Sequence, residues 1–102
     1  MLGIVISNFL LAVAWILHTI LNAYMWIVIA RALLSWVNPD PYNPIVRFLY
    51  SVTEPVLYAI RKRLPVYFGG IDFSPMLVIM AIMVLDNFLV PTLTGLAYRL
   101  GL

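Results

Sequence analysis

The sequence feature that most constrains the fold is an almost unbroken apolar run from Leu2 to Val37. As a helix that rises about 1.5 Å per residue, this run would extend about 54 Å, whereas the hydrocarbon core of a bilayer is roughly 30 Å thick. It is therefore long enough to span a membrane, with part of it tilted, broken or lying in the interface. A second apolar segment, about residues 74–98, predicts a second span.

The composition also indicates a membrane protein. Of the 102 residues, 65% are hydrophobic and only 10% are charged, whereas a soluble domain has roughly 25% charged residues. A chain this short holds one domain, residues 1–102, and a soluble fold of this size could not bury so much apolar surface. We therefore expect the lipid bilayer, or other copies of the chain in a homo-oligomer, to cover the remainder.

The pattern A-x-A at residues 12–14 raises the alternative that the first run is a cleaved signal peptide. No basic region precedes the run, and the apolar sequence continues to Val37. We therefore interpret the run as a membrane helix.

The connection between the spans, about residues 38–73, is the most polar part of the chain. Prolines at positions 39, 41 and 44 should end the first helix by Val37, because residues before proline favour extended conformations. Asn43 and Pro44 then suit the cap and first turn of a new helix. We expect the triplet Thr53–Glu54–Pro55 to break this helix, which leaves two short amphipathic helices, about 44–52 and 56–64, in the membrane plane.

The return to the membrane is predicted at a pair of glycines, Gly69 and Gly70, which allow a tight turn. Ser74 is the expected cap of the second span, and Pro75 suits its first turn. Pro91 should kink that helix or end its regular part. The predicted fold is thus all-α, a hairpin of two membrane helices joined by a cytoplasmic stretch with two interfacial helices.

Basic residues set the expected orientation. Arg47, Arg61, Lys62 and Arg63 lie in the connection, and short loops rich in Lys and Arg stay on the cytoplasmic side. The connection should therefore be cytoplasmic, or stromal in a plastid, with both termini on the opposite side. Residues 61–63 are either a solvated topology signal or a contact with anionic lipid headgroups.

Polar residues inside the spans are the sharper functional candidates. Asp86 and Asn87 lie about 20 Å from the cytoplasmic end of the second span on a helical rise. Asn22 lies at nearly the same depth in the first span, with His18 one turn deeper. A carboxylate in hydrocarbon normally finds a partner, so we expect Asp86 to face Asn22, with His18 as a further candidate. This cluster is either a proton or cation site or a polar contact that joins the helices, and the second is favoured.

Arg31 points away from that cluster, because it lies nine residues beyond Asn22 on the same helix. Its candidate partners are the acids of the connection, Asp40, Glu54 and Asp72. A structural ion pair is favoured over an anion site, since three acids are near at hand.

Several other classes of function find no support in the residues. Cysteine is absent, and a lone His with one carboxylate is a poor set of ligands, so we predict no metal and no cofactor. Three adjacent cations without a basic face do not predict nucleic-acid binding. No arrangement of nucleophile, base and acid is evident, and the chain is predicted not to be an enzyme.

Four motifs in order carry a family resemblance: DPYNP at 40–44, TEP at 53–55, IRKRLP at 60–65 and GGIDFSP at 69–75. The chain resembles the YggT (YlmG) family over essentially its whole length. The resemblance implies an integral protein of the bacterial inner membrane or of plastid membranes, in a family linked with cell division, nucleoid distribution and osmotic tolerance. It implies no defined activity and no catalytic residues.

Two functions therefore stay open. The preferred one is a non-enzymatic assembly or scaffold component that presents its connection to lipids or protein partners. The alternative is a subunit of a homo-oligomeric ion-conducting or transport-related assembly with Asp86 in the pathway. Two helices are too few to enclose a pathway, so either function needs further copies or a partner.

Overall fold

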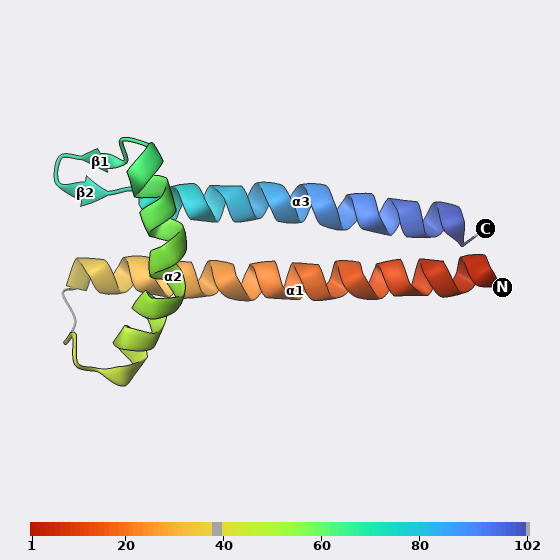
Figure 1. Ribbon diagram of the computed structural model, residues 1–102, viewed down its shortest axis with the longest axis horizontal. Helices are drawn as coiled ribbons and strands as arrows, with labels where there is room; N and C mark the ends of the chain where they lie inside the picture. Colours follow the sequence, from red (N-terminus) through yellow and green to blue (C-terminus); the bar gives the residue numbers. More distant parts are fainter. Residues whose placement is uncertain (38–39, 102) are drawn as a thin grey trace. The chain divides into compact units, whose positions relative to one another are not determined.

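The computed structural model describes residues 1–37 and 40–101, so the predictions for Asn38 and Pro39 lie outside the described part. The elements in order are α1 (Leu2–Val37), α2 (Pro44–Arg63), β1 (Tyr67–Phe68), β2 (Ile71–Asp72) and α3 (Ser74–Leu100) (Figure 1). Contacts group the chain into two compact units. Unit 1 comprises Met1–Ala23 with Ile82–Leu102, and unit 2 comprises Tyr24–Ala81.

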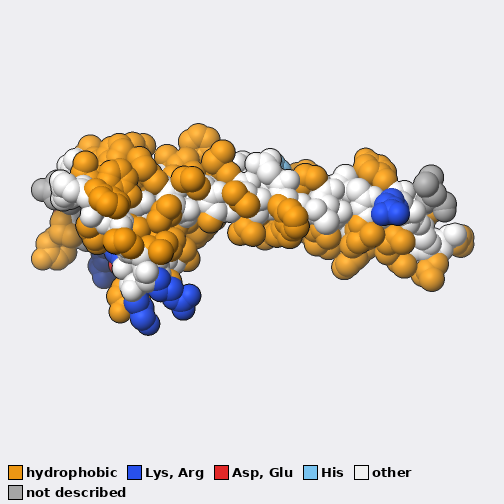
Figure 2. Space-filling view, turned by 90° about the horizontal axis from the view of Figure 1, so that it is seen from above, with side chains coloured by type: hydrophobic (Ala, Val, Ile, Leu, Met, Phe, Trp, Pro, Cys, Tyr) orange, Lys and Arg blue, Asp and Glu red, His pale blue; other side chains and the backbone are white. Residues whose placement is uncertain are grey.

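Two helices, α1 and α3, are long and apolar enough to cross a membrane. Only 11% of the most apolar part of each helix is buried within the chain, unlike the core helix of a soluble protein. Phe9, Trp15 and Phe88 are all more than half exposed, and hydrophobic side chains cover most of the face in Figure 2. The bounds of α1 coincide with the apolar run from Leu2 to Val37, whereas α3 continues through Pro91 to Leu100.

Small residues bring the two helical segments of unit 1 together. A Cβ atom at Gly3 would overlap the carbonyl oxygen of Leu100, so only glycine allows this approach. Ala97 on α3 is fully buried. Small residues let helix backbones approach closely where lipid removes the hydrophobic drive to associate. The segments run antiparallel, because Gly3 meets Leu100 while His18 meets Asp86.

The helix α2 begins as predicted. Asn43 is its cap, with Oδ1 accepting from the backbone N–H of Ile45 at 2.9 Å, and Pro44 occupies the first position. Val46 faces the interior of unit 2, whereas the apolar Phe48 is 58% exposed. The helix therefore presents apolar surface outward as well as inward.

The predicted break at Thr53–Glu54–Pro55 is wrong, and α2 is one helix instead of two short ones. A proline inside a helix costs about 3 kcal/mol, because it removes one hydrogen bond and crowds the preceding turn. Thr53 and Leu57 on either side of it are fully buried. Tertiary contacts on both sides of Pro55 thus keep the helix continuous.

The two glycines form the predicted turn, but within a small strand pair that the sequence did not predict. Strands β1 and β2 pair antiparallel with Tyr67 opposite Asp72. Gly69 and Gly70 connect them with φ of 60° and 81°, the pattern of a two-residue hairpin turn that glycine adopts without steric cost. Strands of two residues carry no alternating pattern by which a sequence could reveal them.

The start of α3 differs from the prediction. Ser74 is the first residue of the helix, and its backbone N–H donates to Asp72 Oδ1 at 2.9 Å. The Ser74 hydroxyl, expected to cap the helix, is buried without a hydrogen-bond partner among the described residues. Asp72 supplies the acceptor instead, and a negative charge is favourable beside the first turn of a helix.

Candidate functional site

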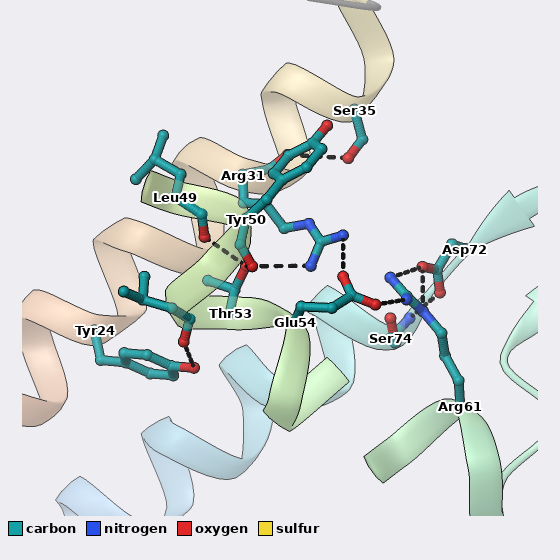
Figure 3. Close-up of polar contacts among 11 residues, drawn as sticks. Tyr24, Arg31, Ser35, Leu49, Tyr50, Thr53, Glu54, Arg61, Asp72 and Ser74 are labelled. Carbon is teal, nitrogen blue, oxygen red and sulfur yellow. Dashed lines mark hydrogen bonds and ion pairs between the residues drawn. The ribbon is translucent and has the colours of Figure 1, made fainter. Parts of the chain in front are cut away.

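A buried arginine of α1 contacts several side chains of α2 (Figure 3). Arg31 is 6% exposed. Its Nη1 donates to Thr53 Oγ1 at 3.1 Å, and its Nη2 donates to Glu54 Oε2 at 2.8 Å. The Thr53 hydroxyl in turn donates to the carbonyl of Leu49 at 2.7 Å. The ring centroid of Tyr50 lies 4.6 Å from the guanidinium carbon, a cation–π contact that also joins α1 to α2.

Glu54 extends these contacts to the strand pair. Its Oε1 accepts from Arg61 Nη1 at 2.8 Å, and Arg61 contacts Asp72 Oδ2 through Nε at 2.9 Å and Nη2 at 2.7 Å. Two positive and two negative side chains from α1, α2 and β2 are thus joined in one chain of contacts. We call Arg31, Thr53, Glu54, Arg61 and Asp72 the Arg31 network.

The environment of the network favours its charged state. Partial burial opposes the charge on Asp72, but hydrogen bonds from Ser74 and Arg61 and the charge of Arg61 outweigh it and lower the pKa of Asp72. Burial also opposes the charge on Arg61, whereas the hydrogen bond to Asp72 and the charges of Asp72 and Glu54 raise its pKa. Both groups are therefore ionised at neutral pH.

The acids expected beside Arg31 have three different positions. Glu54 contacts it directly, and Asp72 is reached through Arg61. Asp40 lies apart, with Oδ1 accepting from the backbone N–H of Tyr42 at 3.0 Å.

The three cations at the end of α2 differ in exposure. Arg61, a candidate either for a solvated topology signal or for contact with anionic lipid, has a side chain that is 19% exposed and pairs with Glu54 and Asp72. Two carboxylates of the chain thus share the charge of Arg61. Lys62 and Arg63 are exposed, so both alternatives stay open for them.

Unit 1 brings together His18 and Asp86. His18 Nδ1 lies 2.8 Å and 3.0 Å from the two carboxylate oxygens, and the two side chains are 50% and 23% exposed. Asn22, expected to face Asp86, is exposed and makes no such hydrogen bond among the described residues. Asn87 is also exposed and donates from Nδ2 to the carbonyl of Met83 at 2.8 Å. Of the four residues of the predicted cluster, only His18 and Asp86 therefore contact each other among the described residues.

A pocket of about 220 Å³ lies beside the Arg31 network. Arg31, Ala32 and Trp36 line it from α1, Asp72 from β2 and Met76 from α3. It thus combines apolar walls with one positive and one negative side chain.

Within residues 1–37 and 40–101, no group of three or more His, Asp and Glu side chains could hold a metal ion. His18 and Asp86 offer two ligands, whereas catalytic zinc sites have three from the protein.

The sequence model of the CCB3/YggT family matches residues 10–93. The chain belongs to the CCB3/YggT family. The matched range includes both polar contacts described above, and the resemblance carried by the four motifs is confirmed.

Curated relatives of this YggT-family chain occur in several bacteria. An uncharacterised protein of Pseudomonas aeruginosa is 28% identical over 98% of this chain and 52% of the relative. An uncharacterised protein of Haemophilus influenzae is 40% identical over 84% of this chain and 46% of the relative. The uncharacterised protein YggT of Escherichia coli K12 is 37% identical over 70% of this chain and 37% of the relative. The chain thus spans about half, or less, of the length of these relatives. No solved structure matches it.

Sequence reasoning missed two residues that contact Arg31 in unit 2, Tyr50 and the buried Thr53. The signal was present, because Tyr50, Thr53, Glu54 and Leu57 are spaced as neighbours on one face of a continuous helix. Treating Pro55 as a helix break concealed that spacing.

Proposed function

We propose that this chain is a non-enzymatic component of a membrane assembly in which copies of the chain associate within the bilayer. The observation that carries the proposal is the exposure of polar side chains midway along α1 and α3. His18 is half exposed even while it contacts Asp86, and Asn22 and Asn87 are exposed as well. Such groups are costly against lipid and normally face protein or water. A second copy would cover them.

The Arg31 network supports the scaffold part of the proposal. It joins α1, α2 and β2 by charged hydrogen bonds, which are about twice as strong as neutral ones. The connection is therefore a fixed surface instead of a loose loop, suited to present one face to partners. Its exposed Phe48, Lys62 and Arg63 suit a position among lipid headgroups, with the cations against anionic lipid.

The basic residues of the connection support a cytoplasmic position for α2 and the strand pair, with both termini across the membrane. The proposed location is the bacterial inner membrane or, as the alternative, a plastid membrane. The proposed processes are those that the family resemblance implies, namely cell division, nucleoid distribution and osmotic tolerance.

The mass of the intact particle in mild detergent tests the assembly. We expect a multiple of the 11.6 kDa chain mass, and we expect Asn22→Leu with Asn87→Leu to shift the particles toward monomer. Thr19→Val with Thr92→Val is the matched control, because a hydroxyl has a single donor and these two already donate to carbonyls of their own helices. The amide of Asn87 also donates to its own helix, but it keeps a second N–H and an acceptor oxygen for another copy. A monomer before any substitution would contradict the proposal.

The His18–Asp86 contact favours a second candidate, an ion-conducting or transport-related homo-oligomer. An ionisable pair inside a span is a common element of proton and cation pathways, and the half exposure of His18 would let it line a path between copies.

Flux of protons or monovalent cations into liposomes tests the second candidate. Flux that Asp86→Asn abolishes while the particle mass stays unchanged would favour transport. A stable oligomer without flux would contradict the transport function and favour the assembly function.

A further inference from the structure

The pocket beside the Arg31 network presents one charge of each sign. Arg31 lines it from α1 and Asp72 from β2, and Figure 3 shows the two residues connected through Glu54 and Arg61. A ligand with a single charge would meet a like charge in this pocket. Charge complementarity instead favours a ligand that carries both a cation and an anion.

Arg31 has donor capacity that the chain does not use. A guanidinium has five N–H donors, of which Thr53 and Glu54 engage one on each Nη. Nε is buried and has no hydrogen-bond partner among the described residues. The remaining N–H group on each Nη can donate to an acceptor in the pocket that Arg31 lines. The guanidinium matches the geometry of phosphate oxygens well.

Asp72 can accept a further donor. Its Oδ1 accepts from the backbone of Ser74, and its Oδ2 accepts from Arg61. A carboxylate offers about four acceptor positions, so an ammonium group can share it.

We propose that this pocket binds the headgroup of a zwitterionic phospholipid with a primary ammonium, the phosphoethanolamine class. The phosphate accepts from Arg31, and the ammonium donates to Asp72. The volume of about 220 Å³ suits a headgroup and leaves the acyl chains outside.

The position of the pocket favours a lipid over a soluble phosphate compound. Trp36 belongs to the last turn of α1 and Met76 to the first turn of α3. The ends of membrane-spanning helices lie at headgroup level, where tryptophan is enriched. Trp36 is 64% exposed and Met76 is 48% exposed, so the apolar walls continue outward to meet acyl chains. The inference rests on the proposed membrane position of these helices, and self-association is not required.

Native mass spectrometry of the full chain in detergent, with three lipids of identical acyl chains, tests the proposal. We expect phosphatidylethanolamine to be retained about fivefold more strongly than phosphatidylcholine or phosphatidylglycerol, equivalent to about 1 kcal/mol. Phosphatidylcholine lacks N–H donors for Asp72, and phosphatidylglycerol lacks the cation.

A substitution that fills the pocket provides an independent test. Ala32 lines the pocket and lies outside the network contacts, so Ala32→Leu should reduce phosphatidylethanolamine retention to the level of phosphatidylcholine. Ala59→Leu on the exposed side of α2 is the matched control and should retain the lipid. Circular dichroism checks that both variants stay helical.

Equal retention of the three lipids by the unsubstituted chain would overturn the proposal without any variant. Equal retention by Ala32→Leu and Ala59→Leu would overturn the assignment to this pocket. Soluble phosphoethanolamine that binds as tightly as the lipid would overturn the lipid assignment. The same spectra count the copies per particle, so a monomer that keeps the preference contradicts only the proposed assembly.

Discussion

The two polar contacts of the chain differ in how completely the chain encloses them. In unit 2, Arg31 is 6% exposed and is contacted by Thr53, Glu54 and Tyr50. In unit 1, His18 is 50% exposed and pairs with a single side chain, Asp86. The chain encloses the first contact almost completely, whereas the second leaves polar surface uncovered on an apolar helix.

This difference indicates separate roles for the two units. A buried charge with several partners is costly to disturb, because removing one partner leaves the other without compensation. A half-exposed pair holds its own chain together weakly and remains available to another molecule. In the proposed function, unit 2 would be the fixed scaffold, and unit 1 would supply the polar surface that a second copy covers.

The largest expected effect is at Arg31. We expect Arg31→Gln to lower the free energy of unfolding in detergent by about 3 kcal/mol, because it removes a buried charged hydrogen bond to Glu54 and leaves Thr53 without its donor. Thermal unfolding followed by circular dichroism measures this. Arg47→Gln is the control, because Arg47 is exposed and its loss should change stability by less than about 0.5 kcal/mol.

A double-mutant cycle with Glu54→Gln isolates the pair itself. The expected coupling between Arg31 and Glu54 is about 1–2 kcal/mol, within the range for residues in direct contact. It is limited because the Glu54 side chain is 46% exposed. A coupling near zero would mean that the enclosed Arg31–Glu54 pair stabilises the chain no more than the half-exposed His18–Asp86 pair.

The elements of the fold that could be predicted from sequence are those with strong local signals. The apolar length of α1, the Asn43–Pro44 helix start and the double-glycine turn were all recognised. The continuity of α2 through Pro55 could not be recognised in the same way, because it depends on burial of Thr53 and Leu57. Burial of that kind is a tertiary property that overrides the local preference against proline.

The same reasoning applies to the candidate sites. The list of acids near Arg31 followed from the sequence, but the choice of Glu54 required α2 to be one helix that presents residues 53 and 54 together. The role of Asp72 at the start of α3 depends on the turn that brings it beside Arg61. Helix depth placed Asp86 near both His18 and Asn22, and only the structure shows that His18 makes the contact.

A smaller effect is expected when acid protonates Asp72. Because its pKa is lower in the folded chain than its ordinary value, the unfolded chain binds a proton first as the pH falls. The stabilisation is thus present above about pH 4, the range of an ordinary aspartate, and is lost as the pH falls further. The difference in melting temperature between the unsubstituted chain and Asp72→Asn should shrink below that pH. A constant difference down to pH 2 would contradict a stabilising role for the charge.

The His18–Asp86 contact should contribute less than the Arg31–Glu54 pair. We expect a coupling of about 0.6 kcal/mol from a cycle of His18→Gln and Asp86→Asn, the average for hydrogen bonds between membrane helices. The measurement belongs in detergent at low protein concentration, where copies are separated. A coupling as large as that of Arg31 and Glu54 would mean that the polar contact of unit 1 stabilises the chain as strongly as that of unit 2.

The smallest effect on stability is expected at Lys62 and Arg63, which are exposed beside the enclosed Arg61. Replacing both with Gln should change the free energy of unfolding by less than about 0.5 kcal/mol. It should also weaken association with anionic lipid by about 1 kcal/mol per residue. Arg61→Gln should instead lower the free energy of unfolding and leave lipid association nearly unchanged. It leaves Glu54 and Asp72 without a shared cation while removing no exposed charge. Comparing phosphatidylglycerol retention with melting temperature for the two variants separates lipid contact from internal pairing. If Arg61→Gln lost lipid and kept its stability, the internal pairing of Arg61 would contribute little, and the enclosure that distinguishes unit 2 would rest on Arg31 and Glu54 alone.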